Sequence, residues 1–119
     1  MHNRTMTLPQ DRWRAQLDDL TEKFAGGSVT IEVLDREFGD EQEAERLPLA
    51  YIEYDPKDGV VIVAVGGNSA RYPVVLRHIV QDPQRIVVDT LGDGDDAPAA
   101  VDVTGGDGGQ TILTIHPPA

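Results

Sequence analysis

The fold of this chain is decided by Val60-Val61-Ile62-Val63-Ala64-Val65, six apolar residues in a row, entered through Asp55-Pro56-Lys57-Asp58-Gly59 and left through Gly66-Gly67. Alternate side chains of a strand point to opposite faces, so an unbroken apolar run between turn residues predicts a strand that is covered on both faces. The rest of the sequence offers one helix to cover a face. We therefore expect a fold-back of the sheet, a second subunit or a bound apolar ligand to cover the other.

The helix is predicted over residues 8–25, where four large apolar residues share one stripe at spacings of four, three and four: Trp13, Leu17, Leu20 and Phe24. Thr7 is positioned to serve as the N-cap, and Gly26-Gly27 supplies the stop. A helix that lies on a sheet needs such a stripe for the core. We therefore assign the stripe to the core rather than to a binding site.

The other predicted elements are strands, at residues 28–35, 47–54, 60–65, 85–90, 101–104 and 111–115. The turn at residues 55–59 joins two of them into a hairpin, because proline fixes one dihedral and glycine accepts a positive one. Residues 36–46 are too acidic to bury and predict an exposed loop or a frayed helical turn. Residues 72–80 fit either a short strand or one to two helical turns, and the last hairpin is expected to be terminal and partly exposed.

These elements predict an α+β fold, with the N-terminal amphipathic helix packed on a curved, mainly antiparallel sheet of about six strands. At 119 residues the chain is long enough for one domain with a core. We expect residues 1–7 to form a flexible N-terminus and residues 8–116 to form the domain. The absence of cysteine excludes disulfides, thiolate metal sites and cysteine nucleophiles.

The charge balance restricts the partners. Twenty-one acidic and ten basic residues give a formal net charge of −11, which repels phosphate backbones and anionic lipids. We expect no nucleic-acid partner and no membrane partner. The sequence shows no signal-peptide pattern and no apolar segment of membrane-spanning length, so we expect a cytoplasmic protein.

No catalytic, metal or cofactor motif is complete. His78 precedes Asp82 by four residues, but a general base also needs a nucleophile, and the elbow-like Gly67-Asn68-Ser69-Ala70-Arg71 has Arg where the closing Gly belongs. The acidic glycine loops at residues 93–96 and 105–110 lack the ligand spacing of calcium sites. We therefore predict no catalytic residue, no metal and no cofactor, and we favour a protein that is not an enzyme.

The order of features resembles a family of small bacterial proteins of unknown function. The residues that carry the resemblance span about three quarters of the chain: Trp13 with Leu17, Ile31-Glu32-Val33, Leu47-Pro48-Leu49, Tyr54-Asp55-Pro56-Lys57-Asp58, and His78-Ile79-Val80 followed by Pro83 and Ile86. None of them is a mechanistic signature. The resemblance therefore implies a single domain and no particular activity.

Two classes of function remain. The first is an accessory or regulatory module that binds another protein or a second copy of itself, because residues 49–54 and 60–65 present more apolar surface than one helix covers; a related third hypothesis is an acidic partner for a basic protein. The alternative is a small-molecule-binding or hydrolytic domain with a pocket between helix and sheet. Its walls would be Tyr51 and Tyr54, and its polar anchors Arg77 and His78.

Overall fold

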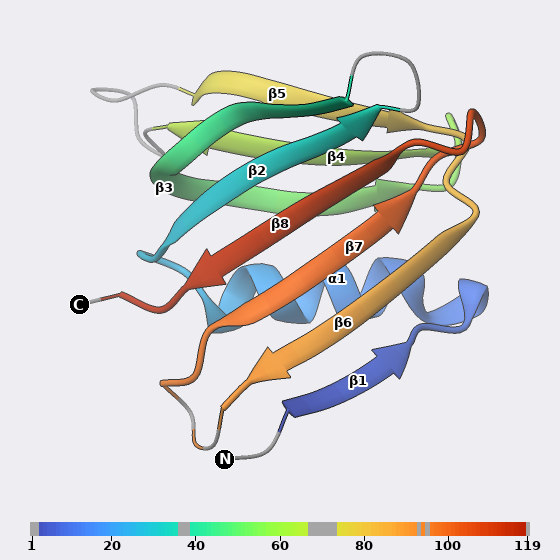
Figure 1. The fold of residues 1–119 in the computed structure, drawn as a ribbon. Helices are drawn as coiled ribbons and strands as arrows, with labels where there is room; N and C mark the ends of the chain where they lie inside the picture. Colours follow the sequence, from blue (N-terminus) through green and yellow to red (C-terminus); the bar gives the residue numbers. More distant parts are fainter. Residues whose placement is uncertain (1–2, 36–38, 67–73, 93, 95, 119) are drawn as a thin grey trace.

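The computed structural model describes residues 3–35, 39–66, 74–92, 94 and 96–118. In this part of the chain eight antiparallel strands form one sheet in the order β1-β6-β7-β8-β2-β3-β4-β5 (Figure 1). The elements in chain order are β1 (Asn3–Thr7), the 3-10 turn η1 (Gln10–Arg12), α1 (Trp13–Lys23), β2 (Ser28–Asp35), β3 (Gly39–Asp55), β4 (Val60–Gly66), β5 (Val74–Gln81), β6 (Arg85–Leu91), β7 (Ala99–Thr104) and β8 (Gln110–His116). None of the helices described here is long and apolar enough to cross a membrane.

The sheet bends into two layers through β3. The first half of β3 pairs with β2 and the second half pairs with β4, and both pairings contain register shifts. Arg46 has a φ of 48°, which marks a local bulge, and Pro48 follows where the pairing changes partner. Figure 1 shows the front layer, made of β1, β6, β7, β8 and β2, and the back layer, made of β4, β5 and the second half of β3.

The core fills the space between the two layers and α1. On the helix, Trp13, Leu17 and Phe24 are buried and Leu20 is half-buried, so the predicted stripe is confirmed as core. It meets inward residues from both layers, among them Val29, Ile31, Val61, Val63, Val101, Val103, Leu113 and Ile115. Each buried side chain of this size contributes about 1.5–3 kcal/mol relative to an exposed one. Burial of this kind holds α1 against the sheet.

The helix ends as predicted but begins differently. The Gly27 N–H donates to the carbonyl oxygen of Phe24 at 2.8 Å, and a Cβ on Gly27 would lie 2.1 Å from the carbonyl oxygen of His116. Glycine is therefore required where the chain leaves α1 and meets the end of β8. Thr7 is not the N-cap, because it pairs with Val87 as the last residue of β1.

The predicted α+β fold with about six strands is wrong, because the described chain is mainly antiparallel sheet. Residues 3–7, expected to be a flexible N-terminus, form β1 and pair with β6. Residues 39–46, expected to be a loop or a frayed helical turn, form the first half of β3. Neither segment is rich in apolar residues. β1 is an edge strand whose Met6 is 58% exposed, and the acidic half of β3 is held by backbone pairing with β2, so neither strand needs an apolar pattern to form. Hydrophobic patterning does not detect strands of this kind.

Two further predictions concern the C-terminal half. The ambiguous segment at residues 72–80 is a strand within its described part, β5. The last hairpin, β7–β8, is not peripheral, because β8 pairs with β2 and β7 pairs with β6. This hairpin therefore forms the centre of the front layer. The predicted hairpin through residues 55–59 is confirmed, with Gly59 at a φ of 65°.

Candidate functional site

Tyr51 and Arg77, two of the four predicted ligand-binding residues, lie together on the outer face of the back layer. They flank Ala64 in the register of β3, β4 and β5, and the Arg77 Nε–H donates to the Tyr51 hydroxyl at 3.1 Å. Ala64 is fully buried beneath this pair although it points outward. The apolar run of β4 is thus covered by the core on one face and partly by long neighbouring side chains on the other. On that outer face Ile79 is 48% exposed.

Tyr54 and His78 lie elsewhere. The Tyr54 ring packs edge-on against Trp13, with ring centroids 5.2 Å apart. His78 points to the inner face, because successive residues of β5 alternate, and its Nε2 lies 3.1 Å from Thr111 Oγ1. The four side chains therefore occupy three separate places rather than one pocket between helix and sheet. Their role in ligand binding stays a prediction.

The remaining motifs of the sequence are only partly described by the structure. The elbow-like residues 67–71 lie outside the described residues, as do Asp93 and Asp95 of the first acidic loop. The second glycine loop is the turn between β7 and β8, in which the Gly109 N–H donates to Asp107 Oδ1 at 2.9 Å. No group of three or more His, Asp or Glu side chains within the described ranges is arranged to hold a metal ion.

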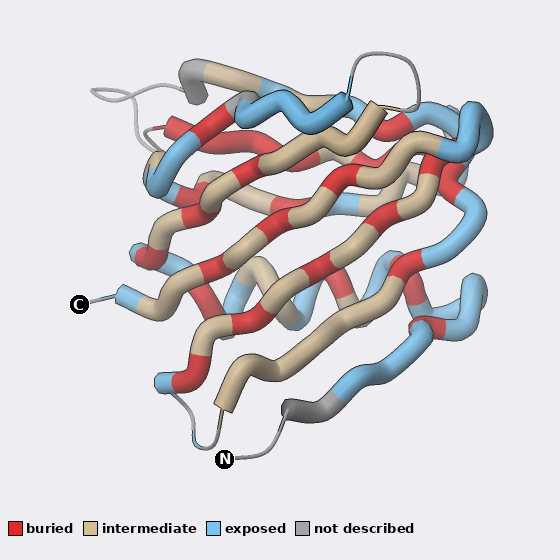
Figure 2. The backbone as a smooth tube through the Cα atoms, in the orientation of Figure 1, coloured by how far each residue is buried: buried red, intermediate tan, exposed pale blue. Residues whose placement is uncertain are grey.

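The outer face of the front layer is the first candidate site. The register places Val87, Asp102, Ile112 and Glu32 side by side across β6, β7, β8 and β2. These outward side chains are half-buried by their neighbours alone, because no described element lies over this face (Figure 2). Threonine and alanine occupy the adjoining outward positions: Thr30, Ala100, Thr104 and Thr114.

Asp102 is the unusual residue of this face. Its Oδ2 accepts a hydrogen bond from Gln110 Nε2 at 3.2 Å, whereas its Oδ1 is fully covered and has no hydrogen-bond partner. Desolvation by the surrounding side chains raises the pKa of Asp102, the nearby Asp89 adds to the rise, and Arg85 opposes it. The Oδ1 atom of Asp102 is therefore an unsatisfied hydrogen-bond acceptor. The sequence places Asp102 outward but does not reveal its cross-strand neighbours.

Other ionisable groups of the same face leave it negative. Asp89 and Glu32 are half-buried outward residues on β6 and β2. At one end of the face, burial and secondarily Arg46 lower the pKa of His116, which disfavours the charged imidazolium. Arg85, at the opposite end of β6, is exposed. The centre of the face therefore carries carboxylates among apolar and threonine side chains.

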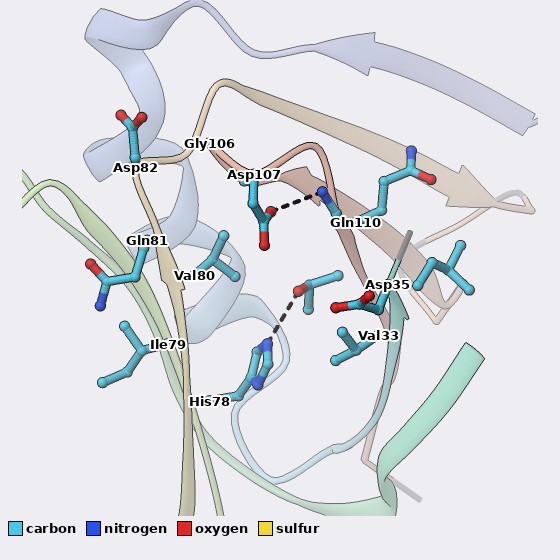
Figure 3. Close-up of a pocket in the computed structure, with 14 residues that line it drawn as sticks. Val33, Asp35, His78, Ile79, Val80, Gln81, Asp82, Gly106, Asp107 and Gln110 are labelled. Atoms are coloured by element: carbon cyan, nitrogen blue, oxygen red, sulfur yellow. Dashed lines mark hydrogen bonds between the residues drawn. The ribbon is translucent and has the colours of Figure 1, made fainter. Parts of the chain in front are cut away.

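A cavity of about 330 Å³ at one end of the two layers is the second candidate site. Its walls come from the end of β2, from β5 and from the β7–β8 turn (Figure 3). His78 is the one predicted site residue that lines it. No sequence pattern indicates that Asp35 and Asp107 join His78 there, because the three residues belong to segments far apart in the chain.

Comparison with known proteins places the chain in a family. Residues 4–119 match the model of a family of unknown function, DUF5335. The chain belongs to this family. The resemblance seen in the sequence is thereby confirmed, and membership of DUF5335 assigns no activity. An uncharacterized protein of Aquifex aeolicus (strain VF5) is 29% identical over 113 residues, which cover 95% of this chain and 93% of the relative. No solved structure matches the chain.

Proposed function

We propose that this DUF5335 protein is a non-enzymatic interaction module that binds a basic segment of a partner protein through the outer face of its front layer. Asp102 lies at the centre of the contact. A lysine or arginine of the partner forms an ion pair with the Asp102 carboxylate, while the partner's apolar groups cover Val87 and Ile112. The protein would act by recruiting or masking that basic segment.

The observation that carries the proposal is the unpartnered Oδ1 of Asp102. A desolvated carboxylate oxygen without a hydrogen bond lowers the stability of the folded chain, and such losses are typical of binding sites. A cationic group of the partner beside the carboxylate offsets this loss, and exclusion of water by the partner strengthens the ion pair. The half-buried apolar and threonine side chains around Asp102 give the contact its area.

The charge of the molecule favours a basic partner over a second copy. Two copies of a chain with a net charge of −11 repel each other. If the same faces met, Asp89, Asp102 and Glu32 of one copy would lie near those of the other. A basic partner instead meets complementary charge, which also accelerates association. Native mass spectrometry distinguishes the two complexes by mass.

The test compares two charge-neutralising variants. The wild type, Asp102→Asn and Asp58→Asn are each purified gently from the protein's own host, and bound proteins are identified and then re-tested as purified pairs by calorimetry. Asp58 is an exposed residue of the turn between β3 and β4, so it reports the loss of one negative charge elsewhere. We expect Asp102→Asn to weaken the partner's affinity about tenfold or more, with Asp58→Asn close to the wild type. A partner that binds both variants equally would refute the assignment of this face.

A further inference from the structure

The end cavity has an apolar wall and a polar floor. Val33 of β2 and Val80 of β5 point into it (Figure 3), and both pack in or against the core. At the floor, His78 Nε2 lies 3.1 Å from the hydroxyl of Thr111. Thr111 is only 4% exposed and is the one buried polar side chain among the described residues. A polar pair inside an otherwise apolar interior offers oriented donors and acceptors to whatever enters the cavity.

This floor is better suited to binding than to catalysis. A nucleophilic hydroxyl must reach the reacting atom of its substrate, but the Thr111 side chain is almost completely covered. Its hydrogen bond to His78 therefore fixes the position of the imidazole ring in the cavity. The pair gives the cavity a rigid polar end.

Two carboxylates face the same space. Figure 3 shows Asp35, at the end of β2, and Asp107, in the β7–β8 turn, both directed into the cavity. Asp107 is held by the N–H of Gly109 at 2.9 Å. The turn itself is closed by a hydrogen bond from the Gly105 N–H to the Gly109 carbonyl oxygen at 2.9 Å. The carboxylate of Asp107 is thus positioned before any ligand arrives, which lowers the ordering cost of binding.

The neighbouring turn holds this rim in place. The Gly106 N–H donates to the carbonyl oxygen of Gln81 at 3.2 Å, which joins the β7–β8 turn to the end of β5. A Cβ on Gly106 would lie 2.9 Å from Cβ of Asp82, so glycine permits the close approach of the two segments. The β7–β8 turn and the end of β5 are therefore joined at the rim of the cavity.

The charge of the lining selects the class of ligand. Among the described residues that line the cavity, three are aspartates (Asp35, Asp82 and Asp107) and none is lysine or arginine. An anion would be repelled by the lining and by the net charge of −11. A metal ion is not favoured, since the described His, Asp and Glu side chains form no group that could hold one. A volume of about 330 Å³ lies at the lower end of the range for small-molecule sites.

We infer that this cavity binds a small organic cation, a primary ammonium or guanidinium group on a short apolar body. The cationic group lies between Asp35 and Asp107, and the apolar body packs against Val33 and Val80. This site is separate from the face around Asp102, so the inference does not depend on the proposed function.

Three probes of similar size but different charge test the inference: n-butylammonium, butyrate and 1-butanol. Each is titrated into the wild-type protein at constant ionic strength, and NMR follows the methyl groups of Val33 and Val80 and the ring of His78. We expect saturable shifts with n-butylammonium at millimolar concentration and none with the other two. Equal shifts with butanol or butyrate, or no saturable shift with n-butylammonium, would overturn the inference.

Charge-neutralising variants then locate the site. In Asp107→Asn the side-chain oxygen still accepts from the Gly109 N–H, so the turn is retained while the charge is lost. We expect the affinity for n-butylammonium to fall about threefold to fivefold in Asp107→Asn, a similar loss in Asp35→Asn, and no measurable binding in the double variant. Asp58→Asn is the control and should bind as the wild type does. Unchanged affinity in the double variant would contradict a site between these carboxylates.

Discussion

Replacing Asp102 by valine should stabilise the protein while weakening its partner contact. The substitution removes a desolvated carboxylate whose Oδ1 has no hydrogen bond and leaves a β-branched residue between Val87 and Ile112. A buried unsatisfied polar atom costs about 1–3 kcal/mol. Asp102 is half-buried and keeps Gln110 as a donor, so the lower limit applies, and we expect a gain of about 1 kcal/mol.

Thermal unfolding measures this gain. With an unfolding entropy of about 2.1 cal/mol/K per residue over 119 residues, 1 kcal/mol raises Tm by about 4 °C. The gain must also depend on pH. Because the pKa of Asp102 is raised in the folded state, the folded chain binds this proton more tightly than the unfolded chain does. The destabilisation that the ionised Asp102 causes in the wild type is therefore full above the folded-state pKa, and it disappears as the pH falls below the unfolded-state pKa.

Two controls separate charge from side-chain shape. Asp102→Asn removes the charge at nearly constant shape, and Ala100→Val adds a β-branched residue at the next outward position of β7 without removing a charge. We expect Asp102→Asn to retain part of the gain and its pH dependence. If Asp102→Val lowers Tm at pH 7, or if its gain is the same at pH 3 and pH 7, the carboxylate is not a source of instability and the argument for the binding face fails.

Three further substitutions test the fold. Thr21→Val removes the hydroxyl that accepts from the N–H of Ile52 at 3.0 Å and donates to its carbonyl oxygen at 2.9 Å. It should lower the unfolding free energy by about 2 kcal/mol. Thr21→Ser keeps a hydroxyl and should lower it less, so equal losses in the two variants would contradict this role. Gly27→Ala forces a Cβ against the carbonyl oxygen of His116. Chemical denaturation should show an unfolding free energy lower by about 3 kcal/mol or more. A variant with the same denaturation midpoint as the wild type would refute that contact. Tyr51→Phe loses an exposed hydrogen bond and should shift the stability by less than about 0.5 kcal/mol, so a larger change in Tm would show that its hydroxyl holds the back layer.

The elements that were predicted correctly follow from the properties of residues that lie close together in the sequence. The stripe on α1 follows from helical spacing, and the turn at residues 55–59 follows from the dihedral preferences of proline and glycine. The alternation of Val101, Asp102 and Val103 likewise gives the two faces of β7. These features depend on residues close in sequence, so a single chain is enough to read them.

The elements that were missed depend on contacts distant in sequence. β1 is a strand because β6 is beside it, and the acidic half of β3 is a strand because β2 offers its backbone groups. The pairing of β2 with β8 joins segments that are far apart in the chain, and neither strand's pattern specifies it. The same limit applies to function, since the cavity brings Asp35, His78 and Asp107 together from three segments.

The two candidate sites meet on β8. Gln110 points outward and donates to Asp102, while the next residue, Thr111, points inward to His78, so one peptide unit separates the two hydrogen bonds. A cation that draws His78 or Thr111 toward it would displace this part of the strand and alter the bond that Asp102 receives. Coupling of this kind requires that a ligand in the cavity change the hydrogen bonding of Asp102. The side-chain carboxyl signal of Asp102, which does not line the cavity, reports this coupling: it should move during titration with n-butylammonium and remain still in the Asp35→Asn, Asp107→Asn double variant.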